Sequence, residues 1–127
     1  MGERQIEISA GDVIVTAVLN DSDTADELWA ALPITARAQT WGDEIYFSIP
    51  VSVEEAADSQ ETVEMGAVAY WPPGSALCLF WGPTPTSAPG EIRPASAVNV
   101  MGLIDGDPTV LGGVADGTEV VVARMGE

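Results

Sequence analysis

Apolar positions along most of this chain recur with the two-residue period of β-strands. Short runs rich in β-branched residues cover 5–8 and 13–19, and the Gly-Asp pair between them suits a tight turn. We therefore predict an opening hairpin. Strand-like runs resume further along the chain at 44–50, 66–82, 97–104 and 118–125.

The run EIYFSIPV, which begins at Glu44, has the clearest alternation. Ile45, Phe47 and Ile49 point to one side of such a strand, and the residues between them point to the other. Pro50 ends the run because proline cannot donate to a strand ladder. This pattern predicts a strand with one buried face.

One segment has helical spacing instead. Its apolar stripe consists of Ala25, Leu28, Trp29 and Leu32. Thr24 and Glu27 have the spacing of a capping box, and Pro33 stops the helix. We predict the main helix of the protein here.

The run at 66–82, GAVAYWPPGSALCLFWG, predicts a hairpin whose rigid tip is Pro72-Pro73-Gly74, with the glycine supplying a positive φ. The acidic stretch 51–65 predicts an exposed connection with one helical turn at 53–57. Residues 83–96, with four prolines, predict a long stiff loop.

The remaining connection predicts a short helical turn at 108–114 and a turn at Asp116-Gly117. Seven or eight short strands and one real helix predict a mainly β fold, a barrel or a sandwich. At 127 residues and 46% hydrophobic content, the chain predicts a single domain over 1–127.

Composition restricts the function more than the fold. Twenty Asp and Glu stand against four arginines, which gives a net charge of −16 without lysine or histidine. This charge repels phosphate backbones, so we expect no nucleic-acid partner. Such acidity is typical of a halophilic protein kept soluble in concentrated salt, or of a GC-rich genome in which Arg displaces Lys.

Missing residue types exclude much familiar chemistry. Without histidine there is no Ser-His-Asp arrangement, and a single cysteine, Cys78, makes no thiolate zinc site or internal disulfide. Without lysine the chain forms no Schiff base with a carbonyl group, and it lacks the lysine that a phosphate-binding loop requires. We expect no cofactor, no metal and no catalytic residue.

No run is apolar enough to span a bilayer and the first residues do not resemble a signal peptide, so we expect a cytoplasmic protein without a membrane partner.

Three polar candidates have ordinary explanations. Asp43-Glu44, beside Trp41, is favoured as solvated surface over an acid and base pair. Cys78 is expected to be a small buried hydrophobe. Arg93 could hold a carboxylate or phosphate, but pairing with a nearby acid that fixes its loop is favoured.

The aromatic residues are the strongest binding candidates. Tyr46, Tyr70 and Trp71, with Arg93 from the proline-rich loop, are the candidate ligand-binding residues, because some rings on adjacent strands should face outward as a platform for apolar groups. For any individual ring, core packing is the favoured alternative.

Four blocks together resemble a known family. They are TADELWAALP, WGDEIYFSIPV, GAVAYWPPGSALCLFWGPTP and EIRPASAVNVMGLI, and they cover most of 24–104. In this order they are similar to the small prokaryotic cyclophilin-like domain family. The resemblance implies a cyclophilin-like closed β-barrel of about eight strands, with one main capping helix and a short helical turn.

The name of the family suggests prolyl isomerisation, but the residues argue against it. Cyclophilins carry Phe-His-Arg-x-x-Pro, and if IYFSIP matches that strand, Phe47 replaces the arginine. Their Gly-Ser-Gln-Phe-Phe run is most similar to GSALCLF, in which Leu77, Cys78 and Leu79 replace the glutamine and the aromatic pair. Lowering the isomerisation barrier of ~18–20 kcal/mol requires a donor aimed at the amide, so we expect no efficient isomerase.

The expected function is therefore a non-catalytic cyclophilin-like binding module for a peptide segment or small ligand. A weak or divergent prolyl isomerase is one alternative. The other is an oligomerisation domain, in which the aromatic hairpin forms an interface with a second copy of the chain.

Overall fold

The computed structural model of the protein describes residues 4–125. Outside the described residues lie 1–3 and 126–127. The first belong to the N-terminal segment that was compared with a signal peptide, and both belong to the domain expected over 1–127. Within the described part the chain forms nine strands, one α-helix and two short 3-10 helices. The strands are β1 (Gln5–Ala10), β2 (Val13–Leu19), β3 (Ile34–Arg37), β4 (Gln39–Thr40), β5 (Glu44–Ser48), β6 (Ala67–Trp71), β7 (Ala76–Phe80), β8 (Asn99–Asp105) and β9 (Glu119–Arg124). The helices are α1 (Asp23–Ala31), η1 (Pro72–Gly74) and η2 (Pro108–Gly113).

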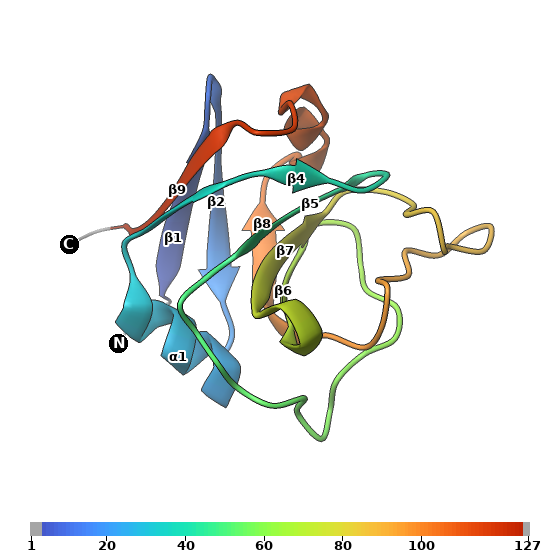
Figure 1. The fold of residues 1–127 in the computed structure, drawn as a ribbon, viewed down its shortest axis with the longest axis horizontal. Helices are drawn as coiled ribbons and strands as arrows, with labels where there is room; N and C mark the ends of the chain where they lie inside the picture. Colours follow the sequence, from blue (N-terminus) through green and yellow to red (C-terminus); the bar gives the residue numbers. More distant parts are fainter. Residues whose placement is uncertain (1–3, 126–127) are drawn as a thin grey trace.

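All strands belong to one antiparallel sheet that curls into a nearly closed barrel (Figure 1). The strand order is β3-β9-β1-β2-β8-β6-β7-β5-β4. The predicted mainly β barrel with one main helix and a short helical turn is confirmed, with nine strands where about eight were expected.

The two edge strands of this sheet are one continuous segment. β3 pairs with β9, β4 pairs with β5, and Ala38 alone separates β3 from β4. The Ala38 amide donates to the Thr118 carbonyl at 2.8 Å, and the Gly117 amide donates to the Ala38 carbonyl at 2.7 Å. This segment therefore joins the two ends of the sheet, and sequence analysis did not predict either of its strands.

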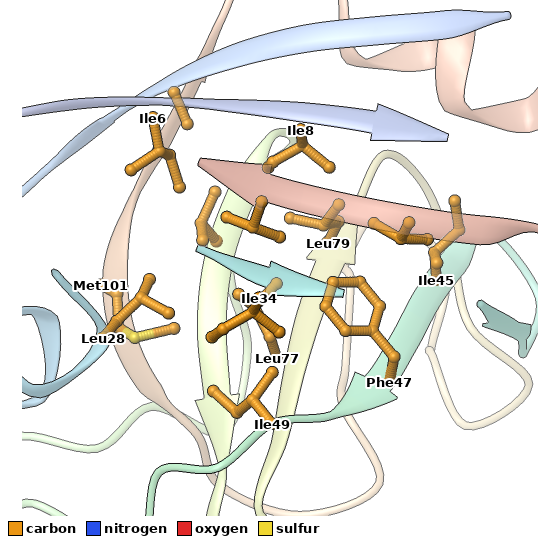
Figure 2. Close-up of a cluster of buried hydrophobic side chains, with 14 of the residues drawn as sticks. Ile6, Ile8, Leu28, Ile34, Ile45, Phe47, Ile49, Leu77, Leu79 and Met101 are labelled. Carbon is orange, nitrogen blue, oxygen red and sulfur yellow. The ribbon is translucent and has the colours of Figure 1, made fainter. Parts of the chain in front are cut away.

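The barrel interior is the main hydrophobic core (Figure 2). From β5, Ile45 and Phe47 point inward, as the alternation predicted, and from β7 Leu77 and Leu79 meet them. Each such side chain contributes roughly 1.5–3 kcal/mol by leaving water. Leu28 of α1 lies next to Met101 of β8 in the same cluster, so the helix covers one end of the barrel.

A second, smaller hydrophobic cluster lies on the outer face of β6 and β7. Its buried members are Ala67, Ala69, Ala76, Cys78, Phe80 and Val98. Two long connections, 51–66 and 81–98, cover this face on the same side of the barrel (Figure 1). Isolated bridges pair Gln60 with Val98 and Val63 with Ile92, so the two connections hold each other in place.

The cap of the helix differs from the predicted one. The helix is capped by Ser22, whose side chain accepts from the Ala25 amide, so the capping box at Thr24 is wrong. Thr24 is buried instead, and its hydroxyl accepts a 3.1 Å hydrogen bond from the Asn99 side chain. That amide also donates to the Glu54 carbonyl and accepts from the Ala56 amide, so it joins β8 to α1 and to the 51–66 connection.

Two expectations about the backbone are also wrong. The helical turn at 53–57 is absent, because the backbone there is bound from outside the segment by Asn99 and Tyr70. At the hairpin tip Ser75, not Gly74, has the positive φ, at 46°. The turns predicted at 108–114 and 116–117 are confirmed.

Salt should stabilise this protein. Within residues 4–125, Arg4 pairs with Asp26, and Arg93 pairs with Glu91 and Glu61, which leaves most of the −16 charge unpaired. Screening by molar KCl relieves the repulsion among these carboxylates. A gain of about 1 kcal/mol corresponds to a rise of roughly 4 °C in melting temperature. A calorimetric melting temperature at pH 7 that is the same in low and molar KCl would refute this prediction.

Candidate functional site

A cavity of about 280 Å³ lies outside the barrel, between its β5–β7–β6 face and the 81–98 connection. Its lining residues are Trp41, Glu44, Tyr46, Trp71, Cys78, Pro94, Ala95 and Val98. The lining is mostly apolar and aromatic, with one carboxyl group. This combination is typical of small-molecule sites.

The alternation of β5 explains why polar groups reach this cavity. Because Ile45 and Phe47 fill the interior, Glu44 and Tyr46 must project outward. Tyr46 lies opposite Cys78 of β7 in the antiparallel register, so both side chains meet on the outer face. The Tyr46 hydroxyl donates to the Gln39 side chain at 3.3 Å.

A tight turn between β4 and β5 brings Trp41 to the cavity rim. The Trp41 amide donates to the Glu44 carbonyl at 3.0 Å, and Gly42 adopts a left-handed φ of 62°. A Cβ at Gly42 would lie 2.8 Å from Pro85 Cδ and 2.9 Å from Thr84 Cα. Glycine is required both for the turn and for its contact with the 81–98 connection.

Trp71 forms a wall between the hairpin tip and that connection. Its ring lies against Gly74, where a Cβ would come within 2.8 Å of two ring carbons. Its indole Nε1–H donates to the Ser96 hydroxyl at 2.7 Å. The half-buried indole is thereby held over the cavity.

Arg93 fixes the connection from outside the cavity. Its guanidinium donates to Glu91 at 2.8 Å and lies 3.8 Å from Glu61. The hydroxyl of Thr84 donates to the Arg93 carbonyl, and the Arg93 amide donates to Ser87. These bonds place the next residues, Pro94 and Ala95, against the cavity.

The carboxyl of Glu44 is the electrostatic centre of the site. The residue is 5% exposed, and burial raises its pKa from 4.5 to about 7, with the Cys78 thiol acting in the opposite direction. No ion pair within residues 4–125 involves Glu44. At neutral pH the carboxyl is therefore divided between its protonated and charged forms.

Cys78 is 2% exposed, and burial together with the charge of Glu44 raises its pKa well above its ordinary value. A thiol in this state is a poor nucleophile, because the reactive form is the thiolate. Its expected place as a small buried hydrophobe agrees with this environment.

The structure separates the four predicted ligand-binding residues. Tyr46 and Trp71 line the cavity. Tyr70 is fully buried inside the barrel, where its hydroxyl donates to the Val51 carbonyl at 2.8 Å and accepts from the Val53 amide. Arg93 is not a lining residue, although Pro94 beside it is.

Sequence reasoning missed Glu44 as a buried group. Asp43-Glu44 was expected to be solvated surface, because a chain with twenty acidic residues places such neighbours together by chance. The signal that was available is the flanking pair Trp41 and Tyr46, two rings beside a carboxylate. Nothing local to Glu44 indicated that a connection some forty residues later covers it.

A second depression of about 390 Å³ lies on the outer face of β2, β8 and β6. It is lined by Val18, Leu19, Asn20, Gln60, Glu64, Ala67, Val100, Gly102 and Leu103. Its one carboxylate, Glu64, is exposed, so this surface lacks a buried polar group.

No helix within residues 4–125 is long and apolar enough to cross a membrane. In the same part of the chain, no three Cys, Asp or Glu side chains gather as a metal-binding group would.

Fold and cavity together define a nearly closed β-barrel protein with a pocket on its outer face. The family model described as cyclophilin-like matches residues 4–123, so the chain belongs to the cyclophilin-like family. It is similar to the solution structure of a hypothetical protein from Archaeoglobus fulgidus, at 45% identity and a TM-score of 0.81, over 96% of this chain and 95% of that one. A comparison with curated proteins finds no match.

Burial of Glu44 makes stability depend on pH. Because its pKa is higher in the folded chain than in the unfolded chain, the folded state binds the proton more tightly. The contribution of Glu44 to stability is therefore full below pH 4.5 and is lost as pH rises through about 7. Between about pH 5.5 and pH 8 the native protein should lose about 2 kcal/mol relative to Glu44→Gln.

Urea unfolding of both proteins at the two pH values measures this difference. The exposed variant Glu64→Gln controls for the loss of one charge and should follow the native protein. Parallel pH profiles for the native protein and Glu44→Gln would contradict the burial of an unpaired carboxyl.

Proposed function

We propose that the protein is a non-catalytic binding module whose outer-face cavity takes up a small ligand or one side chain of a peptide segment. The observation that carries the proposal is the lining: three aromatic rings and one buried carboxyl around about 280 Å³. Aromatic walls supply apolar contact area, and a few fixed polar groups supply orientation.

The cavity offers little for prolyl isomerisation. Among the described residues no arginine lines it, and the two best donors are already used, the Trp71 indole by Ser96 and the Tyr46 hydroxyl by Gln39. Phe47, which takes the place of the cyclophilin arginine if IYFSIP matches that strand, packs in the barrel core. These placements favour binding over an isomerase.

The aromatic hairpin is also poorly suited to an interface between copies. Tyr70 and Phe80 are fully buried within the chain, and Trp71 is half-buried against its own loop. Apolar residues that are well exposed lie elsewhere, at Ile14, Met65, Leu103 and Val110. The hairpin rings therefore support a ligand site better than an oligomer contact.

Phenethyl alcohol is a suitable probe because it is neutral, aromatic and small. We expect its binding to shift the NMR signals of Trp41, Tyr46, Trp71 and Val98 together. Ala95→Trp should weaken the binding of phenethyl alcohol by about tenfold or more. Ala95 is an exposed lining residue, and the indole ring of the new tryptophan would fill the cavity. Ala88→Trp is the matched control, since Ala88 is exposed in the same connection and is not a lining residue.

Shifts centred on Val18 and Leu103 would place the probe in the second depression and refute the proposed site. Equal affinity in the two tryptophan variants would refute it as well.

A further inference from the structure

The carboxyl of Glu44 has no positive partner among residues 4–125. All four arginines lie within residues 4–125 and are engaged elsewhere: Arg4 with Asp26, Arg93 with Glu91 and Glu61, Arg37 with the Gly117 carbonyl, and Arg124 with the Trp29 carbonyl and ring. The chain has no lysine or histidine. A buried carboxylate normally has an ion pair or several hydrogen bonds, because an unpaired charge is costly to remove from water.

The groups that face Glu44 from the packed elements are neutral. They are Tyr46 of its own strand, Cys78 of β7, and Pro94, Ala95 and Val98 of the covering connection. The adjacent Asp43 lies against Gly82, where an added Cβ would clash with its carboxylate. The nearest arginine in the covering connection, Arg93, is bound to acids outside the cavity.

Three aromatic side chains, Trp41, Tyr46 and Trp71, surround this carboxyl. The faces of aromatic rings attract cations, and they do so more strongly when water is excluded. A net charge of −16 further raises the local concentration of cations around the molecule. Both effects disfavour an anionic ligand at this position.

We infer that the cavity binds an organic ammonium ion, a primary amine on a small apolar body, whose nitrogen pairs with the Glu44 carboxylate while the body packs among Trp41, Tyr46 and Trp71. This inference rests on the proposed function, since it specifies the ligand class of the same cavity. The ammonium supplies the charge and the N–H donors that the chain does not provide. Lysine side chains, amino termini and small biogenic-type amines share this chemistry.

The affinities of phenethylamine and phenethyl alcohol for the full-length protein test the inference, because the two probes differ in one polar group. At about pH 8, in about 0.5 M KCl to screen the general field, the amine should bind at least about tenfold more tightly. Glu44→Gln should make the two affinities equal, whereas Glu64→Gln, with the same change of charge on an exposed residue, should keep the preference.

The preference should also fall between about pH 8 and pH 5.5, as the Glu44 carboxyl takes up a proton. Melting curves of each variant in the absence of probe establish that it is folded.

The possible failures are distinguishable. If the alcohol binds in the cavity but the amine is not preferred, the ammonium inference is overturned and the proposed function stands. If the preference for the amine survives in Glu44→Gln, it arises from the overall negative charge of the protein, and the inference is overturned too. A preference for the alcohol that grows at low pH would overturn the inference as well, because it would show protonated Glu44 donating a hydrogen bond to neutral ligands. If neither probe binds in the cavity, both proposals fail.

Discussion

One segment of seven residues, 34–40, determines how this barrel closes. Its first half pairs with β9 at one end of the sheet, its second half pairs with β5 at the other, and Ala38 is the only residue between the two pairings. β5 also pairs with β7 from Glu44 to Ser48, and a slip of one residue in its pairings would exchange its two faces, because the period of a strand is two residues. The inward direction of Ile45 and Phe47, and with it the outward direction of Glu44 and Tyr46, therefore depends on the register that β5 keeps with both β4 and β7.

The outward face becomes a site only because the 81–98 connection covers it. That connection is stiffened by prolines and held by the hydroxyl bonds of Thr84 and Ser87, the Arg93 ion pairs and the Trp71–Ser96 hydrogen bond. An otherwise ordinary surface glutamate is thereby enclosed among aromatic rings. The raised pKa of Glu44 is the electrostatic consequence of that enclosure.

The sequence was most informative where periodicity was strong. The alternation from Ile45 to Ile49, the helical stripe at 25–32 and the Asp116-Gly117 turn all predicted what the structure contains. β3 and β4 were missed because they are short and because four of their six residues are exposed and polar, so tertiary pairing rather than local pattern forms them. The Thr24 cap was wrong because Ser22, two residues earlier, already satisfies the helix terminus.

The site was harder to predict than the fold. Tyr46 and Trp71 line the cavity, but Tyr70 differs from Trp71 by one position and so points into the barrel, where it is fully buried. Two adjacent rings on a strand point to opposite faces of the sheet. The sequence alone does not indicate which ring faces outward, because that depends on the pairing register of the strand. Burial of Glu44 required a contact between segments far apart in the chain, Glu44 with Pro94 to Val98, which no local pattern encodes.

The ammonium site depends on a buried carboxyl, Glu44, that has no cationic partner in the part of the chain that the structure describes. Carbon NMR of the Glu44 side-chain carboxyl, assigned by its absence in Glu44→Gln, measures its titration directly with and without saturating phenethylamine. We predict a titration midpoint of about 7 in the free protein and a lower midpoint when the amine is bound. An ordinary midpoint of 4.5, unchanged by the amine, would contradict it.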